Sequence, residues 1–95
     1  MPATFASRRI LLVEDDQELR YAYAAHLTAK GFLVEEAGDL ASAQKSFGAT
    51  RPDVAVLDFR LPDGTALELL PKLKELEPTV PIIVLSVRDG EADKI

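Results

Sequence analysis

Short, wholly apolar runs alternate along this chain with stretches in which apolar residues recur at helical spacing. The apolar runs cover residues 10–13, 32–34, 54–57 and 82–85. Unbroken apolarity over about four residues is typical of a strand that is buried on both faces. We therefore predict four strands in these ranges and expect the first, third and fourth to be buried on both sides.

Helices are predicted between these strands. The first spans about residues 16–30 and ends with a left-handed cap at Gly31. Its apolar face is predicted to carry Leu19, Ala22, Tyr23 and Leu27. A second, shorter helix is predicted over 41–47, with Asp39 as its N-cap.

A third helix follows a turn at residues 61–64, where Pro and Gly favour a change of chain direction. Thr65 is the expected cap, and the predicted apolar face carries Leu67, Leu70 and Leu73. Pro71 has no N–H, so we expect it to kink this helix or shorten its start. Residues 89–91 indicate the beginning of a further helix.

The order β-α-β-α-β-α-β predicts an α/β fold with an open parallel sheet and helices on both faces. The 95 residues are sufficient for one domain, which we place at 1–95.

Composition excludes several kinds of chemistry. Without cysteine the chain has no disulfide framework, thiolate metal site or cysteine nucleophile, and its single histidine argues against a histidine-rich metal cluster. The net charge of −5 argues against nucleic-acid binding by this segment itself. No apolar run is long enough for a membrane-spanning helix, and residues 1–7 are too short and polar for a signal peptide. We therefore expect a cytoplasmic protein that makes no contact with membranes.

Polar residues follow three of the four predicted strands. They are Glu14, Asp15 and Asp16 after the first, Asp58 after the third and Ser86 after the fourth. Ligands of open parallel sheets bind beyond these carboxyl ends. Carboxylates that converge there repel one another, and a hard cation such as Mg²⁺ relieves the repulsion. A carboxylate can also act as a nucleophile that forms an aspartyl phosphate.

Four segments in this order resemble the receiver domain of two-component response regulators: residues 10–16, 54–58, 61–64 and 81–86. The resemblance implies a flavodoxin-like, doubly wound parallel sheet. It accounts for four strands, three helices and the start of a fourth helix, so the family's fifth βα unit is missing from 1–95.

The resemblance also implies a role for individual residues. Asp58 corresponds to the phosphoacceptor, and Ser86 to the switch hydroxyl that moves towards the phosphoryl group. Asp15 would bind Mg²⁺ directly, whereas Glu14 would act through water or at longer reach. The backbone carbonyl of Arg60 would be a third protein ligand.

By the same resemblance, a sensor histidine kinase would phosphorylate Asp58, and the domain would catalyse only its own phosphorylation and dephosphorylation. Its output would be control of transcription, with DNA contacted only through regions outside this chain. One alternative is a truncated or chimeric βα scaffold without switching. A haloacid-dehalogenase-like phosphatase is a second alternative, but Arg60 stands where such an enzyme needs an aspartate. An uncovered sheet edge further predicts strand exchange or homo-oligomers.

Overall fold

The computed structural model of the chain describes residues 8–85, which form a parallel sheet flanked by helices. The larger elements are, in chain order, β1 (Arg9–Val13), α2 (Gln17–Ala29), β2 (Leu33–Ala37), α3 (Leu40–Thr50), β3 (Val54–Asp58), α4 (Ala66–Leu76) and β6 (Ile82–Leu85). Two very short strands, β4 (Arg60–Leu61) and β5 (Gly64–Thr65), lie between β3 and α4.

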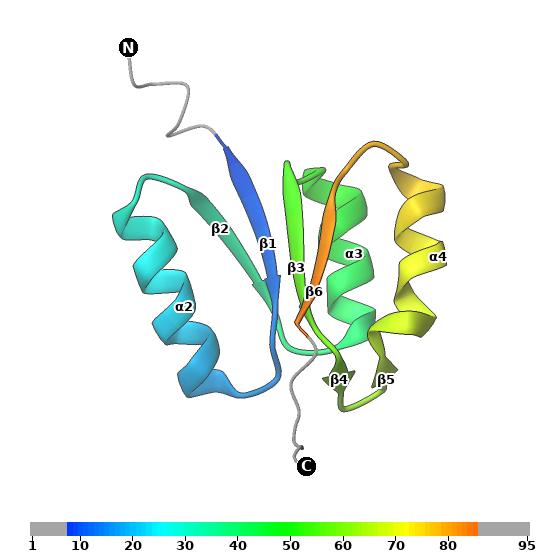
Figure 1. The fold of residues 1–95 in the computed structure, drawn as a ribbon, viewed down its shortest axis with the longest axis horizontal. Coiled ribbons are helices and arrows are strands. Elements are labelled where there is room, and N and C mark those ends of the chain that lie inside the picture. The colour runs from blue at the N-terminus through cyan, green and yellow to red at the C-terminus, as the bar shows by residue number, and fades with distance from the viewer. Residues whose placement is uncertain (1–7, 86–95) are drawn as a thin grey trace.

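The four longer strands are all parallel and follow the order β2-β1-β3-β6 across the sheet. Helix α2 covers one face, while α3 and α4 lie together on the other (Figure 1). This arrangement confirms the predicted α/β, flavodoxin-like architecture. The start of a further helix predicted at 89–91 lies outside the described residues.

The main core fills the space between the sheet and the pair α3 and α4. Phe47 of α3 and Leu69 and Leu73 of α4 are almost completely buried there against Leu11 and Leu57 of the sheet. Burial of one such side chain contributes about 1.5–3 kcal/mol. Packing on this face therefore fixes β1 and β3 side by side.

The opposite face of the sheet is covered less completely. Strand β1 is buried on both sides, as predicted, but β6 is not, because Ile83 is 52% exposed. Helix α2 is the one described helix on this face, and it lies beside β2 and β1 (Figure 1). The prediction that β6 is buried on both faces is therefore wrong within the described part of the chain.

The same incomplete cover corrects the predicted apolar face of α2. Leu19 and Tyr23 are each 40% exposed, and Ala24 is the buried residue of this helix. Tyr23 and Leu27 border an apolar hollow whose floor includes Val56 of β3. The prediction of this apolar face is therefore wrong for Leu19, Ala22 and Tyr23, which are exposed, while Leu27 is half-buried.

The apolar face of α4 also differs from the prediction. Ala66, Leu69 and Leu73 are buried, whereas Leu67 is 62% exposed. Both residue sets have helical spacing, and packing into the core buries the observed one. Pro71 lies inside the helix rather than at its start, so the carbonyl of Leu67 receives no bond from an N–H at that position.

The predicted caps at Asp39, Gly31 and Thr65 lie at the expected positions, and Asp16 is a further cap that was not predicted. The side chains of Asp16 and Asp39 accept hydrogen bonds from the N–H groups of Leu19 and Ser42, at the starts of α2 and α3. Gly31 has a φ of 100° after α2. Thr65 is the N-cap residue of α4, but its hydroxyl makes no capping bond.

Strand β2 is longer than predicted and includes two glutamates, because its pairing with β1 uses backbone groups.

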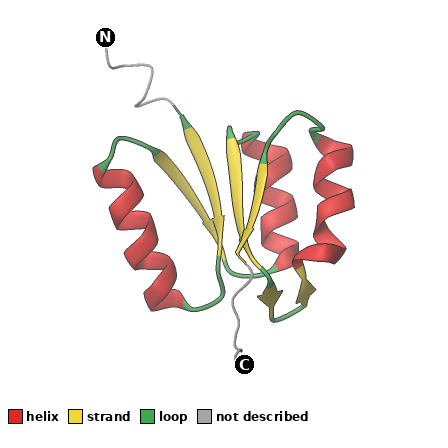
Figure 2. Ribbon diagram, in the orientation of Figure 1, coloured by secondary structure: helices red, strands yellow, loops and turns green. Residues whose placement is uncertain are grey.

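The predicted turn at 61–64 forms a miniature antiparallel pair between β4 and β5. Figure 2 shows this pair at the same end of the sheet as the carboxyl ends of the long strands. Gly64 has a φ of 149°, and a Cβ there would lie 2.6 Å from Leu40 Cδ1. Only glycine fits this backbone and this close approach. Within residues 8–85, no helix is long and apolar enough to cross a bilayer.

These contacts predict opposite effects of the same substitution at two glycines. Gly64→Ala should lower the free energy of unfolding by about 1–3 kcal/mol, because it strains the backbone and displaces Leu40. Gly48→Ala should raise it by about 0.5–1 kcal/mol, because Gly48 lies within α3 and a Cβ there would meet only Leu76, at 3.9 Å. Urea unfolding of both variants measures this, and destabilisation of equal size would contradict it.

Candidate metal and phosphoryl site

The sheet brings Glu14 and Asp58 to neighbouring positions. Val13 of β1 is paired with Leu57 of β3, so the residues that follow them lie side by side at the carboxyl edge. The Glu14 N–H donates to the carbonyl of Ala37 in β2, at 3.0 Å. The first acidic residue after β1 is therefore fixed from both neighbouring strands.

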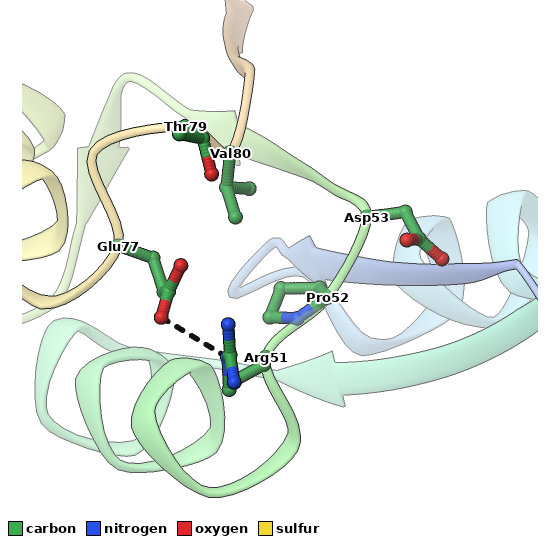
Figure 3. A pocket seen from close by; sticks show the side chains of 6 residues that line it. All are labelled: Arg51, Pro52, Asp53, Glu77, Thr79 and Val80. Carbon is green, nitrogen blue, oxygen red and sulfur yellow. Dashed lines mark ion pairs between the residues drawn. The ribbon is translucent and has the colours of Figure 1, made fainter.

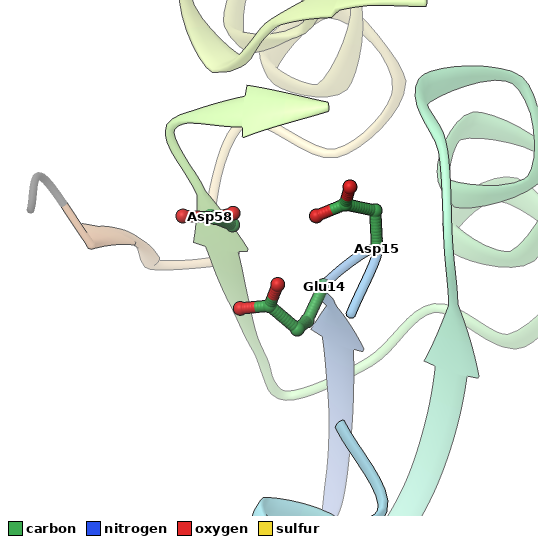
Figure 4. Close-up of side chains that lie close together, drawn as sticks. All are labelled: Glu14, Asp15 and Asp58. Carbon is green, nitrogen blue, oxygen red and sulfur yellow. The ribbon is translucent and has the colours of Figure 1, made fainter. Parts of the chain in front are cut away.

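Three carboxylates converge at this edge. Glu14, Asp15 and Asp58 each offer an oxygen, and these atoms all lie within 4.8 Å of one another. Figure 4 shows that the side chains of Glu14 and Asp15 point towards Asp58, which lies at the end of β3. Glu14 is buried, Asp15 is exposed and Asp58 is intermediate. Hard oxygen donors at this separation, partly open to solvent, fit Mg²⁺, which retains several waters in its protein sites.

The carboxyl of Glu14 has a pKa that departs from its ordinary value. Burial raises the pKa of its carboxyl above the ordinary value, and the charges of Asp58 and Asp15 raise it further. The Asp16 N–H, which donates to Glu14 Oε2 at 3.1 Å, partly opposes this rise. Because the charged form is disfavoured, the cluster destabilises the metal-free fold at neutral pH.

Arg20 supports the loop between β1 and α2, a role that sequence analysis missed. Its Nη1 donates to the backbone carbonyl of Glu14 at 2.8 Å, and its Nε pairs with Glu36 at 3.0 Å. The side chain is only 16% exposed. One signal was available, because a basic residue near the start of a helix is opposed by the helix dipole and suggests another partner.

The remaining predicted site residues have different surroundings. Asp58 Oδ1 accepts from the N–H of Phe59 at 2.9 Å. The guanidinium of Arg60 lies 5.8 Å from the ring centroid of Phe59, and the ligand role of its carbonyl stays a prediction. Asp16 caps α2 rather than joining the cluster. Ser86, the predicted switch hydroxyl, lies outside the described residues.

A second hollow lies at the opposite, amino-terminal edge of the sheet. Its lining is Arg51, Pro52, Asp53, Glu77, Thr79 and Val80 (Figure 3). Arg51 pairs with Glu77 at 3.0 Å, and Asp53 accepts from the Arg9 N–H at 2.7 Å. These contacts connect the ends of α3 and α4 with the strands, and they lie far from the acidic cluster.

Comparison with known proteins agrees with the fold and identifies the family. Residues 10–95 match the family described as response regulator receiver domain. The probable transcriptional regulatory protein TcrX of Mycobacterium tuberculosis is 36% identical over 86 residues, which are 90% of this chain and 37% of TcrX. The KDP operon transcriptional regulatory protein KdpE of Escherichia coli is 38% identical over 86 residues, or 90% of this chain and 38% of KdpE.

A solved structure agrees as well. The non-phosphorylated HemR receiver domain from Leptospira biflexa superposes with a TM-score of 0.80 and 32% identity, over 93% of this chain and 68% of that chain. The fold and the acidic edge thus define a receiver domain. The chain belongs to the response regulator receiver family, and it spans less than two fifths of the length of the curated transcriptional regulators that it matches.

The raised pKa of Glu14 predicts a pH-dependent cost to the metal-free fold. As pH rises above the ordinary value of 4.5 and through the higher folded-state pKa, wild type loses stability that a glutamine at position 14 does not lose. In EDTA, Glu14→Gln should therefore have a higher Tm than wild type at neutral pH. This difference in Tm should disappear below about pH 4.5.

Thermal melts from pH 4 to 8 measure this difference. Glu18→Gln is the matched control, because Glu18 is exposed in the first turn of α2 and lies outside the cluster. It should give no stabilisation at neutral pH, since an acidic residue is favourable at a helix start. A Glu14→Gln variant that melts below wild type at pH 7 would contradict the prediction.

Proposed function

We propose that this chain is the phosphoacceptor module of a two-component phosphorelay and that Asp58 receives the phosphoryl group. The observation that carries this proposal is the convergence of Asp58 with Glu14 and Asp15 at the carboxyl edge of a receiver fold. A cation would relieve the repulsion among carboxylates so close together, and a charged Asp58 is the nucleophilic form.

The transfer step assigns a distinct role to Asp58. One of its carboxylate oxygens forms a bond to phosphorus, while the bond from phosphorus to the donor atom breaks. With a phosphohistidine donor, the electron pair of the broken P–N bond stays on the imidazole nitrogen, which can then take a proton. The product is an acyl phosphate on Asp58. Water later attacks the phosphorus, the bond from phosphorus to the Asp58 oxygen breaks, and inorganic phosphate leaves while the carboxylate is restored.

Mg²⁺ is the cofactor that we assign to the site, with Asp15 and Asp58 as direct ligands, Glu14 acting through water, and the Arg60 carbonyl as a further ligand. When bound, it neutralises charge on the phosphoryl oxygens and on the carboxylates. Glu14 keeps the site electronegative from its buried position, and Arg20 fixes the loop that carries Asp15. Ser86 is proposed to donate a hydrogen bond to the phosphoryl group.

The proposed partners are a sensor histidine kinase as donor and an output region that controls transcription. The added negative charge on Asp58 would bias the surface between two states, which is how a local phosphorylation acts on a distant partner. The names of TcrX and KdpE as transcriptional regulators support this output. Such a relay operates in the cytoplasm, so we propose that location.

Labelling by acetyl phosphate tests the function. With Mg²⁺, wild type should take up at most one phosphoryl group per chain, and Asp58→Asn should take up none, because an amide is not a nucleophile. Asp16→Asn is the matched control: asparagine caps a helix as well as aspartate does, and Asp16 lies outside the cluster. Intact-protein mass spectrometry measures the outcome.

Three results would overturn this assignment. Labelling that persists in Asp58→Asn would place the acceptor elsewhere. Sustained hydrolysis of p-nitrophenyl phosphate, with many turnovers per chain, would instead support the phosphatase alternative. Absence of labelling together with intact Mg²⁺ binding would favour the scaffold alternative.

Self-association through β6 is a second proposed property of the 95-residue chain. Among the described strands, β6 pairs only with β3, and its residue Ile83 is exposed on the face of the sheet that α2 covers incompletely. An unpaired edge is a template for another strand.

Sedimentation velocity should show association that grows with concentration and that Ile83→Lys reduces. Leu67→Lys, at an exposed position on α4, is the control and should associate like wild type. A monomer at all concentrations would refute this proposal.

A further inference from the structure

Asp63 joins two segments that are distant in the sequence. It lies in the turn between β4 and β5, five residues after Asp58. Its Oδ1 accepts from the N–H of Leu40 at 2.7 Å, and its Oδ2 accepts from the N–H of Ala41 at 3.1 Å. These are the first two residues of α3, whose N–H groups have no partner within the helix.

Two aspartates therefore accept hydrogen bonds from different N–H groups at the start of α3. Asp39 is the local N-cap and accepts from the N–H of Ser42 at 2.8 Å and from its hydroxyl at 2.6 Å. Asp63 satisfies the two preceding N–H groups from another part of the chain. Both carboxylates cap the same helix, but only Asp63 ties that helix to the segment that follows Asp58.

The connection extends to both sides of the acidic cluster. On one side, the segment after Asp58 is bonded to its surroundings, since Phe59 donates to the Leu85 carbonyl and accepts from the Ala66 N–H. On the other side, α3 begins three residues after Ala37, whose carbonyl accepts from the Glu14 N–H. Asp63 thus closes a ring of contacts that runs from Asp58 to Glu14 outside the sheet.

The close packing of Gly64 against Leu40 is an independent sign of this junction. A Cβ on Gly64 would lie 2.6 Å from Leu40 Cδ1, so the turn and the helix start are in direct contact. A side chain one residue away therefore needs only the short reach of aspartate to bond both N–H groups. This observation concerns packing and does not depend on the hydrogen bonds.

We propose that Asp63 is a positioning residue for the acidic site. Its two bonds to α3 hold the segment from Asp58 to Leu61 in the arrangement that binds Mg²⁺ and accepts the phosphoryl group. Asp63 touches neither group itself. This inference rests on the proposed function, because it names a residue on which the phosphoacceptor site depends.

Asp63→Ala and Asp39→Ala form a matched pair that tests the role. Each variant removes one negative charge and one carboxylate cap from the same end of α3, so both should lower Tm. Only Asp63→Ala releases the turn. It should weaken Mg²⁺ binding and slow labelling by acetyl phosphate on the order of tenfold, as the loss of an outer-shell support typically does. Asp39→Ala should match wild type in both. Calorimetric titration with Mg²⁺ and timed mass spectrometry measure these effects.

Asp63→Asn extends the test if the alanine variant does not fold. It keeps one acceptor oxygen and should fall between wild type and Asp63→Ala in Mg²⁺ affinity. Equal Mg²⁺ affinity and labelling rate in the Asp63 and Asp39 variants would overturn the positioning role while leaving the function intact. Loss of labelling in wild type itself would instead refute the proposed function.

Discussion

The pairing of β1 with β3 is the constraint on which the rest of this structure depends. The register that aligns Val13 with Leu57 also places Glu14 beside Asp58 and leaves Asp15 at the same edge. Backbone hydrogen bonds and buried apolar side chains on both strands thus force like charges together. Burial, together with the charges of Asp58 and Asp15, raises the pKa of Glu14, and a divalent cation is the kind of ligand that relieves such crowding.

Contacts outside the sheet keep the crowded edge in place. Arg20 holds the carbonyl of Glu14, and Asp63 holds the segment after Asp58 against the start of α3. Both contacts use a charged side chain to satisfy backbone groups of another element, and such hydrogen bonds are stronger than neutral ones. These contacts fix the positions of the two loops that carry the site relative to the strands.

The two faces of the sheet differ in how they serve this edge. Helices α3 and α4 bury Phe47, Leu69 and Leu73 against one face and provide most of the stabilising apolar contact. On the other face, α2 covers β1 and β2, while Val56 and Ile83 border open surface. The well-packed face and the face with exposed apolar side chains are thus opposite sides of one sheet. The site lies at the carboxyl edge between these two faces.

Local patterns in the sequence determined the element types, the caps at Gly31 and Asp39, and the acidic residues at the strand ends, because each depends on neighbours within a few positions. Tertiary structure alone decided which apolar stripe is buried. Leu67 and Leu69 fit helical spacing equally well, and contact with the sheet buries only Leu69. It also assigned Arg20 and Asp63 their roles, since their partners lie up to 23 residues away and no local pattern records such a distance.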